Sequence, residues 1–207
     1  GIEVRGRSHV LRINYRTTEQ IRRAADRMLA DSSDDLDGGT EDRSKTRSLL
    51  RGPTPTFTGF ADRSAELADV VRWVKECRAR GLAPEDIAVF ARTKKRGDEV
   101  ESALSSNGVA AAGLDDEHAT AGAVQVGTMH RAKGLEFKAV LVVDAGADTV
   151  PSPGLLRHAT DPQDREHALA RERQLLYVAM TRARDVLRIT WTGAPSPFLS
   201  PVLEQPS

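Results

Sequence analysis

The stretch AVQVGTMHRAKGLEFKAVLVVDA, residues 123–145, decides the fold of this chain. It contains two short apolar segments, Ala123–Gly127 and Ala139–Ala145, which a polar loop separates. In the second segment apolar side chains occupy both alternating sets of positions, as in a strand that is covered on both faces. We therefore predict that Ala139–Ala145 is a central strand and that helices pack on both sides of its sheet.

Strand patterns and amphipathic helix patterns alternate on either side of this stretch. The further strands are predicted at His9–Ile13, Pro55–Phe60, Ile87–Ala91 and Val186–Trp191. The helices are predicted behind a capping box at Thr17–Gln20, over a stripe from Leu67 to Cys77 that stops at Gly81, at Glu99–Asn107 and at about 166–182. This order predicts an α/β fold with a mostly parallel sheet and helices on both faces.

The loops that follow the predicted strands carry the polar residues of interest. Tyr15 and Arg16 follow the first strand, and the residues from Thr128 to Lys133 follow the fourth. In open parallel sheets, ligands bind in the crevice beyond the carboxyl ends of the strands. We therefore expect both groups to lie at that edge of the sheet.

Length and composition are those of one globular α/β domain, or at most two small domains. The 207 residues are 39% hydrophobic and 29% charged. No apolar run approaches the roughly 18 residues that a membrane helix needs, so we expect no membrane partner. The formal net charge is zero, which argues against a protein that holds nucleic acid by bulk charge alone.

Cysteine, histidine and aspartate usage predicts no metal site in this chain. The single cysteine, Cys77, lies on the apolar side of a helical pattern, so we expect a buried thiol in a reducing compartment. The five histidines lack the spacing of zinc ligands. Asp144 follows an apolar strand, but no G-x-x-x-x-G-K-[ST] phosphate loop occurs in the chain, and we interpret Asp144 as a strand-end residue.

Two segments are predicted to lie outside the core. Residues 31–52 are rich in Asp, Ser and Gly and predict a mobile loop. The tail, residues 194–207, contains Pro195, Pro197 and Pro201 and is not predicted to add to the core.

The loop from Thr128 to Phe137 carries groups that can bind phosphate. Thr128 ends a strand, His130 and Arg131 follow in a turn, and Lys133 precedes a flexible glycine. Hydroxyl, imidazole, ammonium and backbone N–H groups can all donate to phosphate oxygens. An ordinary polar loop between two strands is the alternative, and composition alone does not choose between them.

Three motifs in this chain resemble those of a known family. TMHRAKGLEF, residues 128–137, is similar to the fifth motif of the second motor domain of UvrD/Rep-like superfamily 1 DNA helicases. YVAMTRA, residues 177–183, with the helix from Glu172 onward, is similar to the sixth motif, and NYRT, residues 14–17, to the fourth. The motifs stand in the family's order, so the resemblance covers nearly the whole chain.

The resemblance implies a RecA-like fold and two duties for the fifth motif. Thr128, His130 and Lys133 should face single-stranded DNA. Glu136 should reach the ribose of ATP, which the resemblance makes the cofactor.

The resemblance also implies nucleotide contacts for the other two motifs. Tyr15 should stack on the adenine, and Arg16 should contact a phosphate and take part in catalysis. Arg182 should be an arginine finger, a guanidinium that stabilises the charge developing on the γ-phosphate. We interpret Arg184 and Arg188 as surface residues near a helix end.

The chain also departs from the family pattern. Typical members insert a large mobile domain before the fifth motif, whereas only Val109–Ala123 separates the third helix from that strand here. The phosphate loop is missing, and the chain starts at Gly1 with its first methionine at Met28. We expect residues 1–207 to be an excised second RecA-like domain, cytoplasmic and nucleoid-associated. A first RecA-like domain, absent from this chain, should hold the Mg²⁺ that accompanies ATP, so residues 1–207 alone should be inactive.

Two other classes of function stay open at this point. The chain could be a standalone nucleic-acid-binding or interaction module that descends from a helicase and lacks catalysis. A flavodoxin-like small-molecule domain agrees with the α/β pattern, but it leaves the three motifs unexplained.

Overall fold

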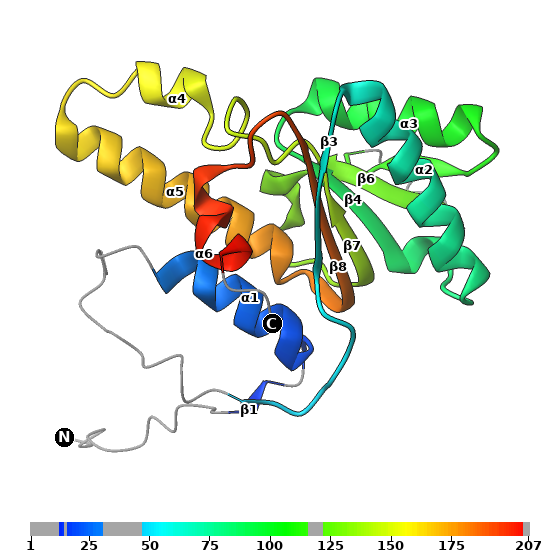
Figure 1. Cartoon of the computed structure of the whole chain (residues 1–207). Helices are drawn as coiled ribbons and strands as arrows, with labels where there is room; N and C mark the ends of the chain where they lie inside the picture. Colours follow the sequence, from blue (N-terminus) through cyan, green and yellow to red (C-terminus); the bar gives the residue numbers. More distant parts are fainter. Residues whose placement is uncertain (1–12, 15, 31–46, 116–121, 205–207) are drawn as a thin grey trace, which may run out of the picture.

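A six-stranded, all-parallel sheet forms the centre of the molecule (Figure 1). Its strands lie in the order β3-β8-β7-β4-β6-β5. Their bounds are β3 Thr56–Phe60, β4 Ile87–Ala91, β5 Ala111–Gly113, β6 Val124–Thr128, β7 Phe137–Val142 and β8 Ala183–Thr192. This computed structural model describes residues 13–14, 16–30, 47–115 and 122–204. The predicted α/β fold is confirmed, and β7 lies inside the sheet as predicted.

Helices cover both faces of this sheet (Figure 1). Helices α2 and α3 lie on one face, and α1, α5 and α6 lie on the other. The helix bounds are α1 Glu19–Ala30, α2 Arg63–Ala79, α3 Lys94–Ser106, α4 Pro153–Arg157, α5 Pro162–Met180 and α6 Ser200–Leu203. Among the described residues, short 3₁₀ segments lie at η2 Pro84–Asp86, η3 Met129–Ala132 and η4 Pro197–Leu199.

The central strands are buried on both faces because their apolar side chains alternate between two cores. Phe90 and Val140 belong to the core under α1 and α5, whereas Val89 and Leu141 belong to the core under α2 and α3. All four side chains are 0% exposed. Burying side chains of this size contributes roughly 1.5–3 kcal/mol each, so these two strands anchor both layers.

The prediction that the tail adds nothing to the core is wrong for its described part. Phe198, Leu199 and Val202 are buried in the same core as α1 and α5. The prolines of this segment suggested breaks, but Pro197 and Pro201 lie in the first turns of η4 and α6. Proline is tolerated there because its missing N–H has no partner within the helix.

The first predicted strand does not belong to the main sheet. Its described end forms β1, Ile13–Asn14, which pairs only with β2, Arg47–Ser48, in a separate parallel pair. Residues 9–12 of the predicted strand and residues 31–46 of the predicted mobile loop lie outside the described residues.

Helix α1 starts where predicted, but the capping box at Thr17–Gln20 does not form. The Thr17 hydroxyl donates to the carbonyl of Thr181 (3.4 Å), and the Gln20 amide oxygen accepts from the N–H of Gly52 (3.0 Å). The Glu19 N–H donates to the carbonyl of Leu50 (2.9 Å). The described end of the predicted mobile loop is therefore held against the start of α1.

Candidate functional site

Two arginines that are distant in sequence converge on one backbone carbonyl. Arg16 donates from Nη2 to the carbonyl oxygen of Leu135 (2.8 Å), and Arg182 donates to the same oxygen from Nη1 (3.1 Å). Arg16 also pairs through Nε with Oε2 of Glu136 (2.8 Å). We call Arg16, Glu136 and Arg182 the arginine cluster. Residues from all three motifs therefore meet at one place.

Backbone hydrogen bonds bring these segments together. The parallel strands β7 and β8 start side by side, because the N–H of Phe137 donates to the carbonyl of Arg182 (3.0 Å). The segment that carries Arg16 is attached next to them, since the N–H of Thr18 donates to the carbonyl of Arg184 (2.9 Å). The arginine cluster is thus fixed by main-chain contacts as well as by its side chains.

The arginine cluster lies at the opposite edge of the sheet from the one predicted for Arg16. Glu136 and Arg182 directly precede β7 and β8, so they lie where these strands start. The rule that ligands gather beyond strand C-termini placed Arg16 wrongly because β1 is not a strand of the main sheet. Tyr15, its neighbour, lies outside the described residues.

The charges of the arginine cluster favour an incoming anion. Burial lowers the pKa of Arg182, and the nearby cation of Arg16 lowers it further. One carboxylate, Glu136, faces the two guanidinium groups. The Arg16 and Glu136 side chains are each 43% exposed, and ion pairs as exposed as this contribute only about 0–1 kcal/mol. Arg16 can therefore exchange Glu136 for another anion at little cost.

Thr128 lies at the other edge of the sheet, as predicted, and His130 and Lys133 follow it on the segment that returns toward the start of β7. Thr128 ends β6, and η3 follows directly. Met129 and Ala132 are buried at the three-residue spacing of a 3₁₀ helix. His130 and Lys133 are left exposed between and after them. We call Thr128, His130 and Lys133 the loop cluster.

One crossover links the loop cluster to the arginine cluster. Because β6 and β7 are parallel, the chain must return from the end of β6 to the start of β7, and residues 129–136 make this return. Gly134 has φ +87°, a left-handed conformation that favours glycine. The loop cluster begins this crossover, and Leu135 and Glu136 end it.

Sequence reasoning missed a buried ion pair beside the loop cluster. Arg92, directly after β4, donates from Nε and Nη2 to the two carboxylate oxygens of Glu172 on α5 (2.8 and 2.7 Å). Oε2 of Glu172 also accepts from the N–H of Ser152 (3.0 Å). A signal was present, since Glu172 interrupts a stripe of buried α5 residues that includes Ala168 and Leu176. An acid in such a stripe indicates a buried partner.

Asp144 lies two residues beyond β7 and is buried, with φ +58°. Burial raises the pKa of its carboxyl group, and its N–H donates to Oε1 of Glu66 (2.9 Å). A cavity of about 280 Å³ beside it is lined by Arg92, Arg96 and Ser152 among others. Within the described ranges, no three His, Cys, Asp or Glu side chains are grouped to hold a metal ion.

The two arginines interpreted as surface residues differ in their environments. Arg184 pairs with Asp185, and both side chains are 38% exposed. Arg188 instead is only 14% exposed and pairs with the buried carboxylate of Asp69 on α2 (2.9 Å). The interpretation of Arg188 is therefore wrong. It lies within β8 and faces α2, not at a helix end.

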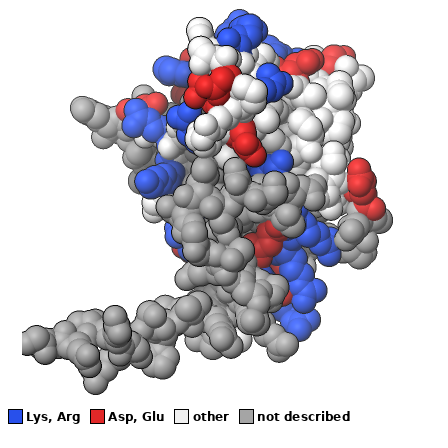
Figure 2. Space-filling view, turned by 90° about the vertical axis from the view of Figure 1, so that its left-hand side faces the viewer, with Lys and Arg blue, Asp and Glu red and all other residues white. Residues whose placement is uncertain are grey.

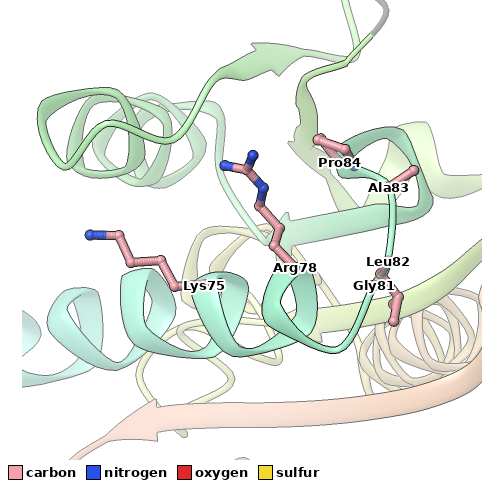
Figure 3. Close-up of a pocket in the computed structure, with 6 residues that line it drawn as sticks. All are labelled: Lys75, Arg78, Gly81, Leu82, Ala83 and Pro84. Atoms are coloured by element: carbon pink, nitrogen blue, oxygen red, sulfur yellow. The ribbon is translucent and has the colours of Figure 1, made fainter.

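The surface carries mixed charge. Figure 2 shows Lys and Arg side chains interspersed with Asp and Glu over the described part of one face. A shallow hollow of about 450 Å³ at the end of α2 is lined by Lys75, Arg78 and residues 81–84 (Figure 3). It contains none of the residues of either cluster. No described helix is both long and apolar enough to cross a membrane.

Comparisons with known proteins agree with the three motifs. The family described as UvrD-like helicase C-terminal domain matches residues 9–118 and 110–194. These two matched segments overlap at residues 110–118 and together cover most of the chain.

The relatives are longer than this chain. ATP-dependent DNA helicase UvrD2 of Mycobacterium tuberculosis (strain H37Rv) is 23% identical over 275 residues, which cover 89% of this chain and 38% of that protein. ATP-dependent DNA helicase PcrA of Staphylococcus aureus (strain NCTC 8325) is 36% identical over 92 residues, which cover 44% of this chain and 12% of that protein. The chain therefore spans well under half the length of these relatives.

A solved structure shows the same fold. The crystal structure of the C-terminal domain of a possible DNA helicase from Lactobacillus plantarum WCFS1 aligns with a TM-score of 0.64 at 23% identity. The alignment covers 91% of this chain and 94% of that one.

Proposed function

Because the chain belongs to the UvrD-like helicase C-terminal domain family, we propose that it is the second RecA-like motor domain of an ATP-dependent DNA helicase or translocase. The observation that carries this proposal is the convergence of Arg16 and Arg182 on the carbonyl of Leu135, beside Glu136. A first motor domain would supply the phosphate loop and the acids that hold Mg²⁺. The assembled protein would act in the cytoplasm, associated with the nucleoid.

Arg182 is the arginine finger in this proposal. Its Nε and Nη1 groups donate to the carbonyls of Val178 and Leu135, which fix the direction of the guanidinium. Such a preorganised cation can stabilise the negative charge that develops on a phosphoryl group without moving. Arg16 supplies a second cation, Glu136 binds the ribose, and Tyr15 stacks on the adenine.

The loop cluster holds single-stranded DNA in this proposal. The Thr128 hydroxyl, the His130 imidazole and the Lys133 ammonium group can donate to successive backbone phosphates. Burial, together with the positive charge of Arg92, lowers the pKa of His130. At neutral pH a neutral imidazole therefore contacts the strand, and Lys133 provides the charge.

The test is replacement of Arg182 in a protein that contains this chain and its first motor domain. Arg182→Ala should lower the rate of ATP hydrolysis by about 10³-fold or more, because the developing charge loses its cation. Binding of a fluorescent ATP analogue should weaken only a few-fold. The measurements are steady-state phosphate release and equilibrium titration.

Arg184→Ala is the matched control for this test. Arg184 is two residues away and pairs with Asp185, so its loss should change the hydrolysis rate less than about threefold. Near-normal turnover in Arg182→Ala would remove Arg182 from its proposed role.

A further inference from the structure

The buried pair of Arg92 and Glu172 joins parts of the chain that are 80 residues apart. Its two hydrogen bonds are parallel and bidentate, the geometry that fixes a guanidinium most firmly. The Arg92 side chain is 15% exposed and that of Glu172 is 4% exposed. Because water is largely excluded, removing either partner would leave an uncompensated buried charge.

Arg92 is adjacent to the loop cluster. In the register of the parallel strands β4 and β6, Ala91 lies opposite Thr128. Arg92 directly follows the last residue of β4, and η3 directly follows the last residue of β6. The charges of both Arg92 and Glu172 act on the pKa of His130, so the pair lies within electrostatic reach of that side chain.

Glu172 lies on the helix that leads to Arg182. Helix α5 contains no glycine, and its only proline is Pro162 at its first position. At a rise of 1.5 Å per residue, the eight steps from Glu172 to Met180 span roughly 12 Å. The helical pattern continues into the finger, since the N–H of Arg182 donates to the carbonyl of Ala179 (3.2 Å).

We infer that Arg92 and Glu172 are a positioning pair that couples the DNA-facing loop cluster to the helix carrying Arg182. This inference rests on the proposed function and adds a route by which bound DNA acts on hydrolysis. DNA that moves η3 would act on Arg92, and the bidentate contact would transmit that displacement to α5. Ser152, whose N–H donates to Glu172, ties the loop before α4 to the same point.

Two substitutions test the pair in a protein that contains both motor domains. Glu172→Gln removes the charge that Arg92 requires, and Arg92→Lys keeps the cation but cannot form the bidentate contact. The measurement is the ratio of the ATP hydrolysis rate with a saturating oligo-dT strand to the rate without DNA. We expect both variants to lower this ratio about tenfold. A purely structural role would lower both rates together and leave the ratio unchanged.

Controls separate this inference from instability and from the proposed function. Glu166→Gln, an exposed acid on the same helix, should keep the wild-type ratio. Thermal melting shows whether each variant is folded, and Arg92→Lys decides the question if Glu172→Gln does not fold.

The possible outcomes differ in what they contradict. Wild-type ratios in folded Glu172→Gln and Arg92→Lys would overturn the coupling pair but leave the proposed function standing, provided that Arg182→Ala still abolishes hydrolysis. A wild-type protein without DNA-stimulated hydrolysis would overturn both.

Discussion

A fully buried carboxylate, Glu66, joins four separate elements of the fold. Its Oε2 pairs with Nη2 of Arg96 on α3 (2.7 Å), and its Oε1 accepts from the Thr190 hydroxyl (2.6 Å) and from the N–H of Asp144 (2.9 Å). The side chains of Glu66 and Arg96 are 0% and 2% exposed. Both oxygens of the carboxylate accept hydrogen bonds, and Arg96 compensates its charge.

Replacing Glu66 should therefore destabilise the domain strongly. Glu66→Ala removes the buried partner of the Arg96 guanidinium and leaves it only the partly exposed Glu99 (2.8 Å), which costs on the order of 3–5 kcal/mol. The free energy of unfolding from urea titration measures this loss. Glu76→Gln, on the same helix with a 45% exposed side chain, should cost less than about 1 kcal/mol. Equal losses in the two variants would contradict the assigned role of Glu66.

At the scale of elements, a segment that is distant in sequence supplies hydrogen bonds to the start of helix α1. Its first acid, Glu19, accepts from the N–H of Ser48 (2.9 Å) as well as from Arg22 and Arg23. Burial raises the pKa of Glu19, but these hydrogen bonds outweigh it and lower the pKa to about 2. A capping box would have made its hydrogen bonds within α1, whereas Glu19 accepts one from the N–H of Ser48 in β2.

This arrangement makes α1 docking dependent on pH. Because the folded-state pKa of Glu19 lies below its ordinary value of 4.5, its stabilising contribution is fully present above about pH 5 and is lost as the pH falls toward 2. Glu19→Gln should therefore lower the free energy of unfolding at pH 7, by on the order of 1–2 kcal/mol. The difference from wild type, measured in urea titrations, should shrink toward pH 2. A constant difference over that range would contradict the assignment.

At the scale of the whole molecule, one crossover links the two clusters, which begin at opposite ends of the strands. The loop cluster begins at the end of β6, and the arginine cluster lies where β7 and β8 start. Helix α5 lies on the face of the sheet that α1 also covers, and it contacts η3. In the proposed function, a nucleotide and a DNA strand would bind these two separate surfaces, which helix α5 connects.

In keeping with the proposed function, we expect residues 1–207 alone not to hydrolyse ATP above background. In the proposed function, Arg16, Arg182 and Glu136 would contact the nucleotide, while the phosphate loop would come from a first motor domain. Phosphate release, measured with and without single-stranded DNA, checks this expectation. Robust hydrolysis by the isolated chain would contradict it. Binding of DNA with no hydrolysis even after a first motor domain is supplied would favour a standalone binding module.

The sequence by itself determined the main helices and strands and named the candidate site residues. A short, continuous apolar run marked Ile87–Ala91 with the bounds that the structure shows, and the apolar run before Asp144 identified a central strand. These predictions succeeded because burial on both faces of a strand leaves a short, continuous run of apolar residues in the sequence. The three motifs likewise contain Arg16, Glu136 and Arg182, so the sequence alone named these residues.

Only the tertiary structure decided which distant groups meet. It paired Arg92 with Glu172, placed Arg16 at the starting edge of the strands, and buried Phe198 in the core. Local periodicity states that a side chain is buried but not what it is buried against. A buried charge or a folded tail depends on partners from other elements, and strand order alone brings those partners together.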